Sequence, residues 1–132
     1  MQKEISVNTT KKKEILDITE RIQKVINGAA EGICLVFALH TTAGLMLGEY
    51  EGGLDADFIN MFGQLSPKGP FLHAHNPNHA PSHLFSSLVG EQIVVPVSGG
   101  NLVLGTWQRI MLVEFDGPRD RRIIVQTIKN GV

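Results

Sequence analysis

The last forty residues constrain the fold most, because they consist almost entirely of short apolar segments separated by turn formers. Residues 98–101 and 116–118 are rich in glycine, proline, asparagine and serine or aspartate, and both stretches separate strand-like segments. The four segments lie at 92–97, 102–105, 107–115 and 122–128. This arrangement predicts an antiparallel meander at the C-terminal end of the chain.

The N-terminal half adds further strands and two helices. Residues 3–9 alternate as in a strand, and the isoleucines that follow recur at helical spacing up to Asn27 and Gly28, a plausible helix stop. Asp17 and Glu20 resemble a capping box for that helix. The continuous apolar run 33–40 predicts a strand buried on both faces. A second strand at 43–48 and an amphipathic helix at 54–65 follow.

Four prolines make residues 66–81 a loop, and Pro81 suits the first turn of a short helix that ends near Leu88. No repeat, low-complexity tract or linker interrupts the 132 residues. We therefore expect one domain, 1–132, of the α+β class, dominated by antiparallel sheet and carrying two to three short helices.

Charge and cysteine content exclude several function classes. The net charge of −1 argues against general nucleic-acid or membrane-surface binding, which normally needs a basic excess. Cys34 is the single cysteine, so no intrachain disulfide can form, and its place in an apolar run indicates a core residue. No apolar run approaches membrane-spanning length. We expect a soluble cytoplasmic protein without nucleic-acid or membrane partners.

Four of the five histidines fall between positions 73 and 83, and the fifth, His40, ends an apolar run. Imidazole binds transition metals and moves protons near neutral pH, so this density predicts a site. One arrangement is a helical stripe of His75, His79 and His83, which the intervening prolines disfavour. A second brings His40, His73 and His83 to one ion with a position left open. The third possibility is that these histidines are ordinary core or surface residues and bind no ligand.

Polar residues near these histidines are further candidates. Thr41 and Thr42 are suited to binding a ligand oxygen, and Glu49 to acting as a base or metal-supporting carboxylate, although each is also ordinary in a loop or strand end. Three arginines have side chains that match phosphate oxygens in a bidentate way: Arg109, Arg119 and Arg121. The alternative for the last two is a solvated hairpin tip, with arginines paired to Asp120 and Glu114.

Several motifs together resemble the secondary thiamine-phosphate synthase family, the YjbQ-like proteins. These motifs are His40-Thr-Thr-Ala43, the histidine segment 73–83, Gly105-Thr-Trp-Gln108 and Glu114-Phe-Asp-Gly-Pro-Arg119. The chain departs from the family pattern at Gly48, where asparagine is usual, and at Phe71, where tyrosine is common; His75 and His79 are additional. The resemblance covers nearly the whole chain and is specific because the motifs occur in the family's order.

The resemblance implies a two-sheet antiparallel core and a homotrimer with a metal site near subunit boundaries. It implies His40, His73 and His83 as ligands of a divalent metal ion, with zinc favoured by imidazole chemistry. His40, Glu49 and Glu114 are the candidate catalytic residues. Thr41, Thr42, Arg109, Arg119 and Arg121 are the candidate residues for binding a small phosphorylated substrate.

Three functions follow as alternatives. A synthase joins a pyrimidine diphosphate to a thiazole phosphate and releases pyrophosphate, which requires cationic groups around the departing anion. A three-histidine zinc site instead favours hydrolysis of a phosphoester or amide by zinc-bound hydroxide. The third alternative is a metal- or metabolite-binding protein without turnover.

Overall fold

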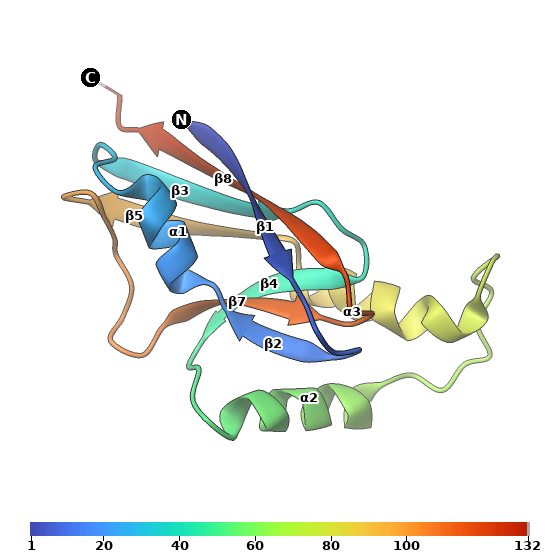
Figure 1. The fold of residues 1–132 in the computed structure, drawn as a ribbon. Helices are drawn as coiled ribbons and strands as arrows, with labels where there is room; N and C mark the ends of the chain where they lie inside the picture. The colour runs from blue at the N-terminus through green and yellow to red at the C-terminus, as the bar shows by residue number, and fades with distance from the viewer. Residues whose placement is uncertain (132) are drawn as a thin grey trace.

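The computed structural model of the protein describes residues 1–131. Within this range the strands are β1 (Gln2–Asn8), β2 (Glu14–Asp17), β3 (Gly32–Ala38), β4 (Ala43–Gly48), β5 (Gln92–Ser98), β6 (Asn101–Leu102), β7 (Arg109–Glu114) and β8 (Asp120–Lys129). The helices are α1 (Thr19–Ile26), α2 (Leu54–Leu65) and α3 (Ala80–Val89), the last preceded by a 3-10 turn at Pro77–His79. The predicted α+β class is confirmed (Figure 1).

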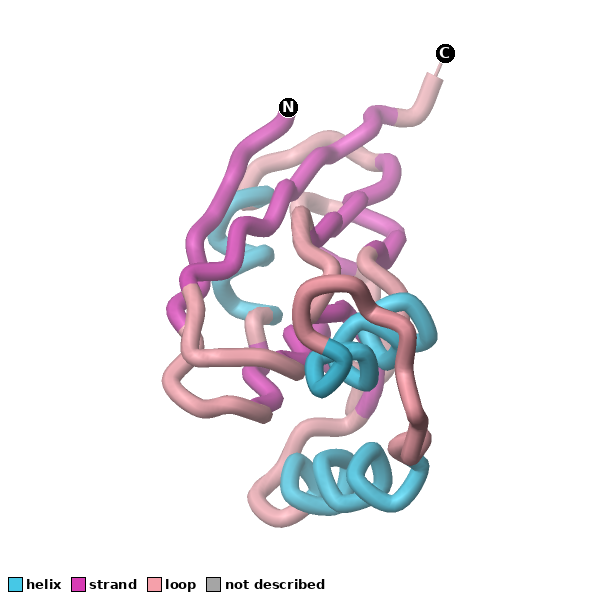
Figure 2. Tube along the Cα trace, turned by 90° about the vertical axis from the view of Figure 1, so that its right-hand side faces the viewer, coloured by secondary structure: helices cyan, strands magenta, loops and turns pink. Residues whose placement is uncertain are grey.

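Two antiparallel sheets form the framework of the described chain. The larger sheet has the strand order β1-β8-β3-β5-β6, and the smaller has the order β2-β7-β4. Helices α2 and α3 lie on the side of the smaller sheet, whereas α1 lies beside the larger one (Figures 1 and 2). The predicted two-sheet antiparallel core is therefore confirmed.

Strand β7 connects two hydrophobic cores. Ile110 and Leu112 belong to the core that the two sheets share with α1, and Met111 and Val113 belong to the core under α2 and α3. Alternate residues of a strand point to opposite faces, so a strand between two cores must be apolar at every position. Glu114 follows this run and is only 1% exposed. A charged group is thus placed at the end of a fully buried strand.

The apolar run 33–40 differs from the expectation of a strand buried on both faces. The strand ends at Ala38, and its buried residues alternate with exposed or half-buried ones. Cys34 and Val36 face the core, whereas Ile33 stands next to Pro96 and Ile128 on the outer face of the larger sheet. The described chain leaves this second apolar face uncovered.

The predicted C-terminal meander is wrong in its connections. Strand β7 pairs with β2 and β4, while β8 pairs with β1 and β3 in the other sheet. The turn after Phe115 therefore carries the chain from one sheet to the other. Strand β2 was not foreseen, because its four residues precede α1 directly and Ile15 and Ile18 fit helical spacing.

The helix predictions hold in position but not in every detail. Asp17 accepts hydrogen bonds from the backbone N–H and hydroxyl of Thr19, at 3.0 and 2.7 Å, and Ile18 occupies the cap position. Glu20 binds Arg109 instead of the helix backbone, so the predicted capping box is wrong. The predicted helix stop at Asn27 and Gly28 is confirmed. In the described range, no helix combines the length and apolar character needed to cross a bilayer.

Candidate functional site

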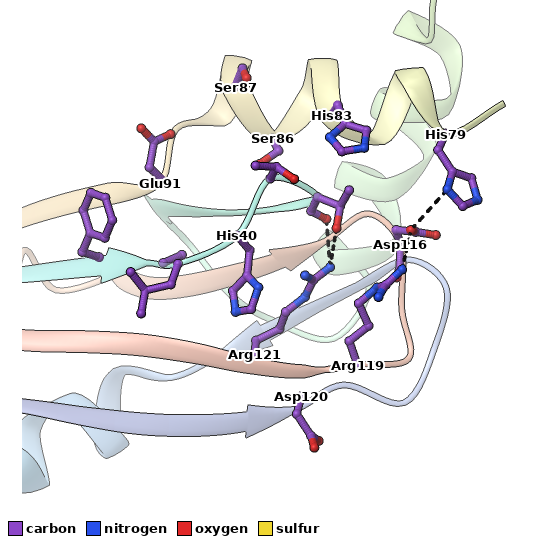
Figure 3. Close-up of a pocket in the computed structure, with 15 residues that line it drawn as sticks. His40, His79, His83, Ser86, Ser87, Glu91, Asp116, Arg119, Asp120 and Arg121 are labelled. Carbon is purple, nitrogen blue, oxygen red and sulfur yellow. Dashed lines mark hydrogen bonds and ion pairs between the residues drawn. The ribbon is translucent and has the colours of Figure 1, made fainter. Parts of the chain in front are cut away.

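An open pocket of about 930 Å³ lies between α3 and the ends of β3 and β8 (Figure 3). It is the meeting point of three parts of the chain that are remote in sequence: the end of β3 with the turn after it, helix α3, and the turn that enters β8. Its polar lining is His40, Thr41, Thr42, His79, His83, Ser86, Ser87, Glu91, Asp116, Arg119, Asp120 and Arg121. Ser86 fixes α3 to β4 by donating to the Ala43 carbonyl at 2.7 Å.

A buried ion pair between Arg121 and Glu114 lies beneath this pocket, and only Arg121 lines it. Arg121 Nε donates to Glu114 Oε1 at 2.8 Å, and Arg121 Nη2 donates to Glu114 Oε2. Nη2 also donates to the hydroxyl and carbonyl of Thr42, at 2.9 and 3.1 Å. Thr9 donates its hydroxyl proton to Glu114 Oε1 at 2.7 Å. We call Thr9, Thr42, Glu114 and Arg121 the floor network.

The floor network keeps the Glu114 carboxylate charged. Burial alone would raise the pKa of Glu114, but hydrogen bonds from Arg121, Thr9 and the Asp116 backbone N–H offset it and leave the pKa below its usual 4.5. Glu114 does not line the pocket. In this structure Glu114 holds Arg121 in place, and its catalytic role stays a prediction.

Arg121 retains one donor group for a ligand. Its Nη1 makes no hydrogen bond with any residue in the range 1–131. No fully buried side-chain nitrogen or oxygen of the described residues lacks a partner, so Nη1 is open to the pocket that Arg121 lines. A side chain that is 2% exposed thus presents one fixed N–H pair to a guest.

A second ionic cluster, centred on Asp116, borders the pocket. Arg119 donates to the Asp116 carboxylate at 3.0 Å, and Lys12 Nζ binds its other oxygen. His79 Nδ1 lies 3.8 Å from Asp116 Oδ2 (Figure 3). Burial alone would raise the Asp116 pKa, but Lys12 and Arg119 hold it below its ordinary value. Arg119 is thus paired with Asp116, not with the predicted Asp120.

His40 enters the pocket from the turn after β3. Its Nε2 accepts a hydrogen bond from the backbone N–H of Arg122 at 2.6 Å. Burial is the main cause that lowers the pKa of His40, and the positive charge of Arg121 adds to it. His40 is therefore neutral at pH 7, and the lone pair of its Nε2 is already engaged.

The three predicted metal ligands are not assembled in this chain. His73 and His83 lie together, with ring centroids 4.8 Å apart, but His73 does not line the pocket. In residues 1–131, no group of three histidine, cysteine, aspartate or glutamate side chains is arranged to hold a metal ion. Because His40 Nε2 is engaged, the three-histidine set does not fit as one site here. His73 and His83 are the two of the three whose rings are adjacent.

The pocket has no excess of positive charge. Arg119 and Arg121 line it together with three carboxylates, Glu91, Asp116 and Asp120. A phosphorylated ligand would therefore enter a nearly balanced site, and its negative charge would be only partly offset by the arginines.

Two candidates from the sequence lie elsewhere. Arg109 binds Asp17 at 2.7 Å and Glu20 at 3.0 Å and does not line the pocket. Glu49 is exposed after β4 and is also outside the lining. Thr41 and Thr42 do line it, and their role in binding a substrate stays a prediction. Thr9 was missed because nothing in its neighbourhood signals a partner 105 positions away.

Cys34 has no part in the site. Its side chain is fully buried, and burial raises the pKa of its thiol to about 11. The prediction of an unreactive core cysteine is confirmed.

Solved structures of similar sequence share this fold along almost the whole chain. A hypothetical protein from Aeropyrum pernix K1 superposes with a TM-score of 0.92 at 34% identity, covering 98% of this chain and 99% of that chain. A protein of unknown function from Sulfolobus solfataricus P2, described as YbjQ-like, gives a TM-score of 0.92 at 36% identity, covering 98% and 97%.

Relatives without a described activity are similarly close in sequence. A UPF0047 protein of Archaeoglobus fulgidus is 41% identical over 126 residues, which cover 95% of this chain and 99% of the relative. YugU of Bacillus subtilis, also a UPF0047 protein, is 35% identical over 129 residues, covering 96% and 98%. The family model described as UPF0047 protein YjbQ-like matches residues 3–130. The chain therefore belongs to the YjbQ-like UPF0047 family, as its motifs predicted.

Proposed function

We propose that this chain is a cytoplasmic enzyme that binds a small phosphorylated substrate in the pocket above the floor network. The observation that carries the proposal is the open Nη1 of Arg121, a buried guanidinium group with every other donor engaged. Fixed guanidinium donors match phosphate oxygens and lose little conformational entropy on binding. Thr41 and Ser87 add hydroxyl groups along the same lining.

The reaction that the resemblance implies is synthesis of thiamine phosphate. The bond between carbon and the diphosphate oxygen of the pyrimidine breaks, and pyrophosphate leaves with the electron pair. A ring nitrogen of the thiazole phosphate bonds to that carbon. The residues of this chain would bind the departing pyrophosphate at Arg121, with Arg119 at the rim, where the developing negative charge needs fixed donors.

We also propose that a divalent metal ion, with zinc as the first candidate, supports the substrate's charge. The proximity of His73 and His83 supports this, because imidazole is a preferred ligand of zinc. In one chain these two side chains would hold the ion, and further ligands would come from the substrate, from water or from a second copy. The metal would neutralise the part of the phosphate's negative charge that Arg119 and Arg121 do not offset.

A homotrimer is the assembly that the resemblance implies, and the uncovered face of the larger sheet supports it. Ile33, Val94 and Ile128 are 37%, 53% and 48% exposed on neighbouring strands. Phe37 alternates with the core residues of β3 and also lines the pocket. Exposed apolar faces of this kind mark association sites. A second copy on this face would border the pocket, and light scattering at working concentration tests the assembly.

The test of the function is formation of thiamine phosphate from the two precursors, with and without zinc or magnesium. We expect wild-type activity and its loss in Arg121→Lys, which keeps the charge but removes the guanidinium fork. Arg21→Ala, a solvent-exposed arginine on α1, is the control and should retain activity. Absence of product under all metal conditions contradicts the synthase proposal.

A hydrolase is the second candidate, because two adjacent histidines also suit a metal that activates water. Cleavage of a model phosphoester that is abolished in His83→Ala would favour it over the synthase. Metal in the purified protein without either activity would favour a binding protein without turnover.

A further inference from the structure

The ring of His40 has only one nitrogen available to a guest. A neutral imidazole carries one N–H and one lone pair, on different nitrogens. The backbone N–H of Arg122 points to Nε2 at 2.6 Å, so the lone pair is on Nε2 and the proton is on Nδ1. A proton or a metal ion at Nε2 would have to displace this hydrogen bond.

His40 and Arg121 line the same pocket. His40 Nδ1 makes no hydrogen bond within residues 1–131, and no buried nitrogen of the described chain is unpartnered, so Nδ1 is accessible. The two side chains reach this pocket from elements remote in the sequence, positions 40 and 121. Figure 3 shows His40, from the turn after β3, and Arg121, from β8, in the pocket lining.

We infer that His40 serves the pocket as a neutral hydrogen-bond donor through Nδ1–H, and that His40 and Arg121 together bind one phosphate group. The phosphate part of this inference rests on the proposed function; the assignment of the proton to Nδ1 does not. The inference differs from the metal-ligand role that the resemblance implies for His40. An imidazole whose lone pair is engaged, and whose other nitrogen is protonated, offers a metal ion no free lone pair.

The donor pair has a physical advantage for a phosphate. A second cation beside Arg121 would be repelled by it, whereas a neutral N–H adds a donor without that repulsion. The hydrogen bond from Arg122 in β8 to Nε2 fixes the orientation of the His40 ring. The ring therefore loses little conformational freedom when the phosphate binds to Nδ1–H.

The proton assignment is tested on ligand-free protein labelled with ¹⁵N and ²H, with metal removed by a chelator. A through-hydrogen-bond N–N coupling experiment should connect the amide nitrogen of Arg122 to His40 Nε2, and His40 Nδ1 should carry the proton. The correlation should persist after addition of zinc chloride alone. Protonation of Nε2, or loss of the correlation when zinc binds to His40, overturns the inference.

The phosphate part is tested by calorimetric titration with inorganic pyrophosphate, using the two amide substitutions of His40. The amide nitrogen of asparagine reaches the position of Nδ1, whereas that of glutamine reaches the position of Nε2. His40→Asn should bind within about threefold of wild type, and His40→Gln should bind roughly tenfold more weakly, as for loss of one hydrogen bond to a charged group. Equal losses in both variants overturn the donor role.

These two measurements separate the inference from the proposed function. If wild-type protein fails to bind pyrophosphate, the phosphate part and the proposed function both fail, and the coupling experiment still decides the proton position. If pyrophosphate binds but Nε2 carries the proton, the inference fails and the proposed function survives. Thermal unfolding followed by circular dichroism confirms that each variant is folded.

Discussion

The floor network and the histidine segment between positions 73 and 83 are built in opposite ways. In the floor network, each charged group lies at a strand end and is held by side chains remote in the sequence, and Glu114 and Arg121 are 1% and 2% exposed. In the histidine segment, only Asn76 has a side-chain hydrogen bond, to its own turn, before α3 begins. The histidine segment is the more conspicuous of the two in the sequence, but the side chains that the structure holds in place belong to the floor network.

This difference has a physical basis. A buried ion pair is tolerated only when its remaining hydrogen-bonding groups are satisfied, so the floor network must be complete before a ligand arrives. Histidines in an open turn cost little when they have no partner, because water solvates them. The clustering of histidines in the sequence therefore indicated the part of the chain near the pocket. The side chains that are already held in place are the buried ones of the floor network.

The largest effect should come from breaking the floor network. Glu114→Ala leaves Arg121 charged, buried and without its carboxylate partner, and should lower the free energy of unfolding by about 3–5 kcal/mol. Urea unfolding followed by fluorescence or circular dichroism measures it. Arg119→Ala is the matched control, because Arg119 is 54% exposed and Asp116 keeps Lys12 as a partner, so the loss should be about 1 kcal/mol or less. Equal losses would remove the contrast between a buried floor and a solvated rim.

A smaller effect is expected at Thr9, which donates to Glu114 and accepts from the backbone N–H of Arg119 at 2.9 Å. Thr9→Val keeps the shape but removes both bonds, and should cost about 1–3 kcal/mol. Thr9→Ser retains the hydroxyl and should recover most of the stability and of the pyrophosphate affinity. If serine does no better than valine, the hydroxyl group is not what matters at this position.

Acid should weaken the floor network. The pKa of Glu114 is lowered in the folded protein, so the unfolded chain binds a proton more readily. Its contribution is complete above the ordinary value of 4.5 and is lost as pH falls through the folded pKa. Denaturant midpoints measured from pH 6 to pH 3 should decline, and Glu114→Gln should flatten the decline. An unchanged slope in this variant would assign the acid sensitivity to other carboxylates, such as Asp116.

The smallest effect on stability is expected in the histidine segment. His73→Ala and His83→Ala should change the free energy of unfolding by less than about 1 kcal/mol without metal, because neither side chain is fully buried. With zinc present, both should lose metal-dependent stabilisation, whereas His40→Asn should keep it. Elemental analysis and thermal shifts with and without zinc measure this. If only His40→Asn lost its bound zinc, His40 would be the metal ligand and this prediction would be wrong.

Much of the fold was predictable because it depends on local signals. Helices α1 and α2 follow from apolar spacing, and Gly28 ends the first of them as expected. The sheet assignment of β7 was not predictable, since its apolar run fits a meander strand as well as a strand between two cores. Which sheet receives it depends on packing against β2 and β4, and the short β2 gives almost no sequence signal.

The candidate site was predictable in part for a similar reason. His40, Thr42 and Arg121 follow from motifs in the sequence, and the structure brings all three to the pocket. The role of each atom was not predictable, because it depends on contacts across many residues. The bond from Arg122 to His40 spans 82 positions. Arg109, in contrast, is as conspicuous in the sequence as Arg121, yet it pairs with Asp17 outside the pocket.

The central claim is that Arg121, held by Glu114, presents Nη1 to a phosphate group. The most direct measurement is a crystal structure of the protein grown with pyrophosphate and zinc. The account predicts a phosphate oxygen within hydrogen-bond distance of Arg121 Nη1 and of His40 Nδ1, with the bond from Arg122 to Nε2 intact. Pyrophosphate bound away from the floor network, or a metal ion on His40 Nε2, would contradict it.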